Sequence, residues 1–228
     1  MNARWLLRVF GPRTPHGLTP QERAGFVAPT ILFTLAATLL LVSIFLPYWR
    51  MTLYAPQYPN GLHLQAYVNR LEGDVREIDM LNHYIGMRKL EDAAQLERSL
   101  SIGMIVALTL IVVAAAFVHS PLTALLTLPA ILFPLFFLVD LHIWMRFFGQ
   151  HLNPEAPLSH AIKPFVPPVL GEGKIGQFRT VATPGEGLLL SSVATVLTIV
   201  GLFLQRMAYK PLRDRLLREA ERRATEES

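Results

Sequence analysis

Four long apolar stretches decide what kind of structure this chain can adopt. The first runs from Ala24 to Trp49 and contains no charged residue. A helix rises about 1.5 Å per residue, so about 20 apolar residues are enough to cross the hydrocarbon core of a membrane. Backbone groups in lipid must be satisfied within their own segment, which favours helices over strands. The sequence therefore predicts four transmembrane helices, over residues 26–48, 100–118, 122–145 and 188–205.

The composition agrees with this class and excludes several others. The 228 residues are 52% apolar or aromatic and 17% charged, with a mean hydropathy of +0.36, whereas average soluble chains carry about 25% charged residues. The absence of cysteine excludes a disulfide scaffold, a thiolate zinc site, an iron–sulfur cluster and a thiol nucleophile. The net charge of +4 is typical of nucleic-acid-binding chains, but here it reflects arginine-rich ends, and we expect no nucleic-acid partner.

The placement of lysine and arginine predicts the orientation in the membrane. Four of the 21 lie in the first 25 residues and seven in the last 23, about twice their density in the two long connections. Positive residues favour the cytoplasmic side, so we expect both termini there and both connections outside. The predicted fold class is thus an all-α membrane protein of four transmembrane helices with a small extracytoplasmic cap, either irregular or α+β.

The predicted segments follow one another simply along the chain. They are a basic cytoplasmic N-terminus (1–25), the first span (26–48), a first outer segment (49–99), a hairpin of two spans (100–118 and 122–145), a proline-rich second outer segment (146–187), the fourth span (188–205) and a charged cytoplasmic helix (206–228). Pro47 is expected to stop the first span, with Tyr48 and Trp49 as an aromatic anchor at the interface.

Periodicity leaves the structure of residues 60–90 open. Apolar residues alternate with polar ones over residues 62–68, which favours a strand, but a 4-3-4-3 repeat over residues 64–78 favours a helix. A hairpin turn at Glu72-Gly73-Asp74 would favour the strand. The second outer segment has six prolines, yet it is too apolar for a disordered linker. We expect it to pack on the first outer segment and to form one cap domain with it.

Two ionisable residues lie inside the predicted third span. Asp140 and His142 stand near its outer end, and charged groups in a membrane usually face the bundle, a partner or a water cavity. Two residues apart on a helix, they point about 200° away from each other, whereas Asp140 and Trp144 share a face. One interpretation is an interfacial Asp140 that reaches water or pairs with Arg146. The other is a metal or proton role.

A second group of candidates lies in the first outer segment. On a helix Met80, His83 and Met87 fall at i, i+3 and i+7 and share a face. Imidazole and thioether ligands suit Cu(I), and they are the only soft ligands in a chain without cysteine. Ordinary packing is the alternative, and Gly86 argues against a regular helix. The sequence has no Gly-rich phosphate loop, His-Glu-x-x-His, nucleophile elbow or Walker motif, so we do not expect an enzyme.

Several strings of residues resemble a known family. They are APQYPNGL from Ala55, LNHYIGM from Leu81, DLHIW from Asp140, GQHLNPEAP from Gly149 and KPFVPPVLGEGKIGQF from Lys163. The family consists of small multi-span bacterial membrane proteins encoded in nitrous oxide reductase gene clusters, beside the lipoprotein copper chaperone of that system. The resemblance covers about residues 45–205. The chain departs from the family at residues 145–148 (MRFF), where the family has an acidic, tyrosine-rich stretch, and this puts a role for carboxylates there in doubt.

The resemblance implies a bacterial inner-membrane protein linked to copper supply for a periplasmic enzyme. Copper would then be held on the outer face by His83, Met87 and His151, with Met80 as a further ligand. Expected partners are the lipid bilayer, the periplasmic copper chaperone and other membrane subunits. Two other functions stay open: a non-catalytic structural or assembly subunit of a larger membrane complex, and a small transporter subunit.

Overall fold

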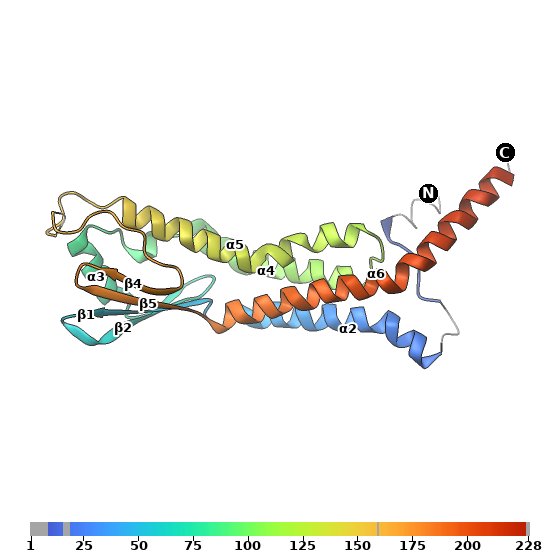
Figure 1. Cartoon of the computed structure of the whole chain (residues 1–228), viewed down its shortest axis with the longest axis horizontal. Helices are drawn as coiled ribbons and strands as arrows, with labels where there is room; N and C mark the ends of the chain where they lie inside the picture. Colours follow the sequence, from blue (N-terminus) through green and yellow to red (C-terminus); the bar gives the residue numbers. More distant parts are fainter. Residues whose placement is uncertain (1–8, 16–18, 159, 227–228) are drawn as a thin grey trace. The chain divides into compact units, whose positions relative to one another are not determined.

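The computed structural model describes residues 9–15, 19–158 and 160–226 (Figure 1). Within them are four long helices and one five-stranded antiparallel sheet. The long helices are α2 (Pro20–Ser43), α4 (Gln95–Ala115), α5 (Leu122–Gln150) and α6 (Glu186–Glu226). The strands are β1 (Trp49–Ala55), β2 (Tyr58–Ala66), β3 (Leu71–Gly73), β4 (Gly171–Ile175) and β5 (Phe178–Pro184), with a shorter helix α3 (Val75–Ile85) and a 3₁₀ turn, η1 (Leu90–Asp92).

Each long helix contains a segment that is long and apolar enough to cross a membrane. Only 28–33% of the residues in these segments are buried within the protein itself. Large apolar side chains on all four helices are exposed, among them Ile31, Leu110, Leu125 and Phe203. A helix that is apolar all round and has few protein contacts needs lipid around it. The prediction of four helices that are suited to cross a membrane is confirmed.

The chain divides into two compact units, which are described separately. The helical unit comprises the described residues of Met1–Leu41, Val106–Leu132 and Ser192–Ser228, and the sheet unit comprises Val42–Ile105 and Phe133–Ser191. In the helical unit, polar side chains tie one helix to the next. Gln205 Nε2 donates to the carbonyl oxygens of Ala115 (2.8 Å) and Val118 (3.1 Å), and Thr195 Oγ1 donates to that of Ile131 (3.2 Å). Such bonds are favoured where water is scarce.

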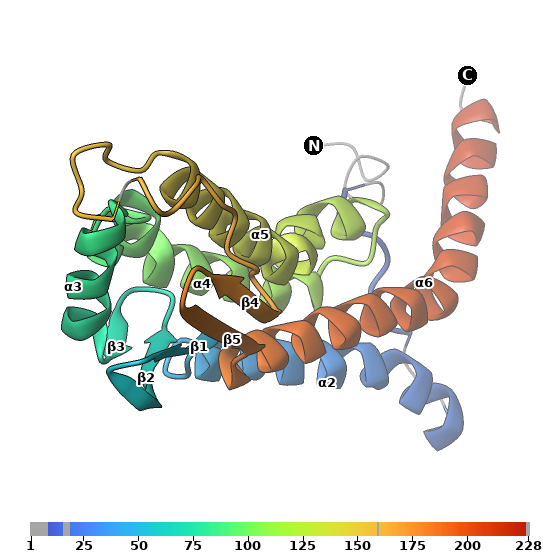
Figure 2. The same cartoon turned by 60° about the vertical axis from the view of Figure 1, so that its left-hand side comes forward.

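The sheet unit joins the two long connections in one sheet of order β3-β2-β1-β5-β4 (Figure 2). Strand β1 comes from the first connection and β5 from the second, and they pair from Trp49↔Pro184 to Tyr54↔Arg179. Alternate residues of β1 are buried, and they pack on α3 and on Met145 of α5 in one apolar core. The expectation that the two connections pack together is confirmed, and the cap is a regular sheet instead of an irregular domain.

The end of the first span differs from the prediction. Helix α2 ends at Ser43, and the aromatic pair expected as an interface anchor is buried: Tyr48 is 0% and Trp49 1% exposed. The Tyr48 amide donates to the carbonyl of Ala66 at 2.8 Å, and the Trp49 indole donates to the carbonyl of Val169 at 2.5 Å. Trp49 belongs to the sheet core because β1 begins there, and the Tyr48 ring packs on Phe133 and Phe137 of α5.

Residues 60–90 contain both of the structures that periodicity left open. The chain is extended through Ala66 and helical from Val75. The tight turn lies at residues 67–70, where the Tyr67 amide donates to the carbonyl of Arg70 at 2.9 Å. The predicted hairpin turn at residues 72–74 is therefore wrong, because Gly73 still pairs with Leu64 in the sheet.

At the other end of the chain, the fourth span and the charged helix form one continuous helix, α6.

Candidate functional site

Three of the four predicted metal ligands line one open depression in the sheet unit. They are His83, near the end of α3, Met87, just after that helix, and His151, just after α5. The fourth, Met80, lies on α3 but does not line the depression, and its side chain is half-exposed. Helix α3 ends at Ile85, so the regular helical face predicted for Met80, His83 and Met87 stops before Met87.

Gly86 shapes this depression. Its φ of +82° ends α3 in the left-handed conformation that glycine adopts without a Cβ penalty. The Met87 amide then turns back to the carbonyl of Asn82 at 2.9 Å. The Asn153 amide donates to the Gly86 carbonyl at 2.8 Å, which fastens the segment after α5 to the end of α3. The depression therefore depends on contacts between segments almost 70 residues apart.

His151 has a defined tautomer in this structure. Its Nδ1 lies 2.9 Å from the carbonyl oxygen of Phe147, which can only accept a hydrogen bond, so Nδ1 carries the proton. In a neutral ring with this tautomer the lone pair is on Nε2, and a backbone carbonyl on the other nitrogen is the usual partner of a metal-ligating histidine. Both His83 and His151 are exposed.

Met87 also lines a second, smaller cavity of about 40 Å³. Two further methionines reach this cavity: Met51 of β1 and Met145 of α5, which are 8% and 9% exposed. Asn82 lines it too, and its buried Nδ2 has no hydrogen-bond partner among the described residues. Met87 is thus shared between an exposed pair of imidazoles and a buried pair of thioethers.

Sequence reasoning did not identify Met51 and Met145 as candidates. Alternation along β1 puts Met51 on the same face as Trp49 and Leu53, which indicates burial but not the partner. Met145 lies in the MRFF string, the point at which the chain departs from the family it resembles. Only the packing of β1 against α5 brings the two sulfur atoms to one cavity.

Two cationic side chains and one carboxylate border the depression. Arg88, Lys89 and Asp92 line it beside the histidines. The Arg88 guanidinium lies 5.4 Å from the centre of the Phe147 ring, which itself lies 4.5 Å from the His151 ring. Cations beside the depression oppose the approach of a free cation, but they favour a partner surface that carries carboxylates.

The two intramembrane polar candidates are separated, as their spacing predicts. Asp140 is half-buried and lines a third cavity together with Trp144, whereas His142 is exposed. The Trp144 side chain interacts with the Asp140 carboxylate. The ion pairs formed among the described residues do not include Asp140 with Arg146, and Arg146 Nε donates instead to Gln150 Oε1 at 3.4 Å.

Over residues 9–15, 19–158 and 160–226, no three His, Asp or Glu side chains gather in a way that would hold a metal ion. The candidate site consists instead of two imidazoles and three thioethers around two adjoining hollows that share Met87.

A comparison of the chain with protein-family models, with curated proteins and with solved structures finds no match.

Proposed function

We propose that this chain is an integral accessory protein of the bacterial inner membrane that receives Cu(I) on its sheet unit. It would pass the ion to a partner that matures a periplasmic copper enzyme such as nitrous oxide reductase. The observation that carries the proposal is the position of Met87, which lines both the open depression and the buried cavity. An ion caught by exposed His83 and His151 can reach buried Met51 and Met145 through this one thioether.

The chemistry of these side chains selects the ion. Thioether and imidazole ligands favour Cu(I) over hard cations, and the chain has no cysteine to compete for it. The apolar walls of the buried cavity keep water away from the ion, which favours the singly charged state over Cu(II). Arg88 and Lys89 at the entrance suit an acidic partner, such as a periplasmic copper chaperone, that delivers or removes the metal.

Copper titration of the full-length purified chain tests the site. Under anaerobic conditions and against a competing Cu(I) chelator, the double variant H83A/M87A should bind Cu(I) at least about tenfold more weakly, which is about 1.4 kcal/mol. The variant M80A is the matched control, because Met80 lies on the same helix but outside the depression, and it should bind like the parent. Unchanged affinity in H83A/M87A would show that the assignment is wrong.

A second pair of variants tests the buried methionines separately from the exposed histidines. M51L and M145L keep the volume of the buried side chains but remove their sulfur atoms. X-ray absorption of the copper-loaded parent should show sulfur and nitrogen neighbours, and the M51L/M145L chain should lose sulfur neighbours while the nitrogen neighbours stay. A parent chain that binds no Cu(I) but co-purifies with other membrane subunits in mild detergent would instead support an assembly subunit.

The orientation in the membrane is a separate part of the proposal. It rests on the lysine and arginine excess at the two ends of the chain. Because the chain has no cysteine, single cysteines report their side without background. A membrane-impermeant maleimide should label E155C in intact spheroplasts and R215C only after lysis, since both positions are exposed. The reverse pattern would place the sheet unit in the cytoplasm.

A further inference from the structure

The sheet unit contains another cavity, of about 120 Å³, that the copper proposal does not use. Its walls come from the β2–β3 hairpin, the first turns of α4 and the part of α5 that belongs to this unit. Most of the lining side chains are aliphatic or aromatic. Two of them, Met104 and Phe136, are also 40% and 52% exposed on helices that are suited to cross the membrane. The cavity therefore borders the surface that these helices offer to lipid.

Three charged side chains stand at this otherwise apolar cavity: Glu97 and Arg98 of α4 and Asp140 of α5. Glu97 is close enough to Asp140 for the two carboxylates to interact electrostatically. Arg98 donates from Nη2 to the carbonyl of Glu91 at 3.1 Å, but its buried Nε has no hydrogen-bond partner among the described residues. Asp140 lies within a predicted span, where a charged group is costly and points to a functional role, and Glu97 and Arg98 stand at the same cavity from the start of α4.

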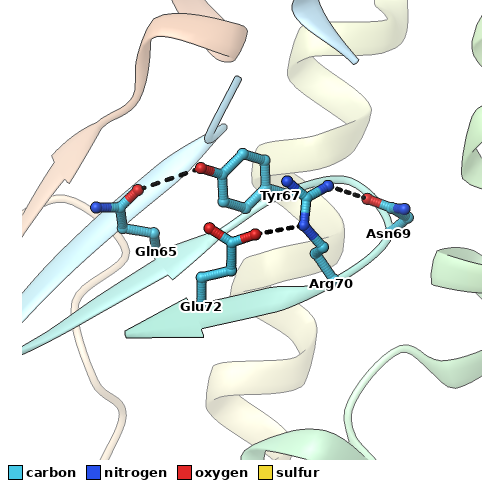
Figure 3. Close-up of polar contacts among 5 residues, drawn as sticks. All are labelled: Gln65, Tyr67, Asn69, Arg70 and Glu72. Atoms are coloured by element: carbon cyan, nitrogen blue, oxygen red, sulfur yellow. Dashed lines mark hydrogen bonds and ion pairs between the residues drawn. The ribbon is translucent and has the colours of Figure 1, made fainter. Parts of the chain in front are cut away.

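The turn between β2 and β3 also borders the cavity, and polar contacts link its side chains (Figure 3). Tyr67 lines the cavity, and the Arg70 guanidinium covers its ring at 3.9 Å. Arg70 is fixed in turn, because its Nε donates to Glu72 at 2.5 Å and its Nη1 to Asn69 at 3.1 Å. These contacts favour the position of the ring at the edge of the cavity, and a largely preformed cavity is typical of a ligand site.

We propose that this cavity binds a phospholipid whose head carries both a phosphate and an ammonium group, as phosphatidylethanolamine does. A segment of an acyl chain fills the apolar part, and the ammonium group lies at Glu97 and Asp140. The phosphate accepts from Arg98. Two carboxylates and one guanidinium match this zwitterionic head, whereas an anionic head without an ammonium group would leave both carboxylates unpaired.

Native mass spectrometry of the full chain, released from nanodiscs, tests the proposal directly. With phosphatidylethanolamine and phosphatidylglycerol of identical acyl chains at equal amounts, the bound lipid should be mainly phosphatidylethanolamine. We expect a preference on the order of threefold or more, as partly exposed charge pairs give. The variant E97Q/D140N should lose this preference, whereas the control E155Q, which changes an exposed carboxylate outside the cavity, should keep it.

Tryptophan fluorescence gives a second readout that does not depend on release from the membrane. Two of the three tryptophans, Trp49 and Trp144, line the cavity, so a W5F chain reports on the cavity alone. Phosphatidylethanolamine with brominated chains should quench it more than brominated phosphatidylglycerol at the same mole fraction. Equal quenching by both lipids, or a preference that survives in a folded E97Q/D140N chain, would overturn the proposal.

Discussion

The backbone amide of Asn153 donates to the carbonyl of Gly86 at 2.8 Å, and this bond joins the two sides of the depression lined by His83, Met87 and His151. A Cβ on Gly86 would lie 2.7 Å from the oxygen and 2.9 Å from the nitrogen of Asn153. His83 and Met87 lie on one side of this contact and His151 on the other. The geometry of the proposed copper site is therefore set by a backbone contact, and not by the ligands themselves.

Replacing Gly86 by alanine should damage both stability and copper binding. The left-handed conformation alone costs a residue with a Cβ about 1–2 kcal/mol, and the contact with Asn153 adds to this. We expect G86A to lower the free energy of unfolding in detergent by at least that amount and to weaken Cu(I) binding. The control is G103A, where a Cβ meets nothing within 4 Å and the position is helical, so stability should be unchanged or slightly higher.

The Trp49 indole should contribute a measurable hydrogen bond between the two connections. It is 1% exposed and donates to the carbonyl of Val169, 120 residues away. W49F keeps an aromatic ring but leaves that carbonyl without its donor, so we expect a loss of about 1–3 kcal/mol in thermal or chemical unfolding followed by circular dichroism. If W49F unfolds like the parent, this bond does not stabilise the sheet unit.

Asp79 should make the stability of the sheet unit depend on pH. Its Oδ1 accepts from the Leu90 amide at 2.8 Å, and burial, reinforced by the charge of Glu91, raises the pKa of this carboxyl above its usual 3.8. The unfolded chain therefore releases this proton first as the pH rises, and the free energy of unfolding falls from pH 3.8 up to the folded pKa.

D79N isolates this effect, because asparagine keeps an acceptor for Leu90 and does not titrate. We expect the difference in unfolding free energy between D79N and the parent to grow in favour of D79N as the pH rises through that range. The measurement is a series of denaturant titrations in detergent at increasing pH. A difference that stays constant with pH would contradict the argument.

His119 should have the opposite pH dependence in the helical unit. Its ring stacks on Tyr209 with 3.8 Å between ring centres, and its Nδ1 lies 3.1 Å from the carbonyl oxygen of Pro12. Burial is the largest effect and lowers the pKa of this imidazole below 6.5. The unfolded chain therefore binds a proton first as the pH falls, and stability decreases from pH 6.5 down to the folded pKa.

H119F tests this prediction, because phenylalanine can still stack on Tyr209 but cannot be protonated. The loss of stability on acidification below pH 6.5 should be smaller in H119F than in the parent, measured by thermal unfolding in detergent. The loss of the bond to Pro12 should lower the stability of H119F at neutral pH by about 1 kcal/mol. An equal loss of stability on acidification in both chains would show that protonation of His119 does not cause it.

The sequence predicts the spans well because hydropathy and length are local properties. A segment such as residues 23–43 must be a helix in lipid whatever surrounds it, since no other structure satisfies its backbone. The grouping of His83 with Met87 is also local, because the two residues lie on one short stretch of chain. Only the family resemblance implies His151, and its position beside them in the structure depends on a contact that no periodicity predicts.

The sequence by itself thus determined that the chain has four membrane-suited helices and that His and Met are its only soft metal ligands. Only the tertiary structure decided that β1 pairs with β5 and that Met51, Met87 and Met145 meet at one cavity. The physical reason is that a period of two shows which face of a strand is buried but not which strand lies beside it. That choice is made by long-range pairing, which here brings residues about 130 positions apart together.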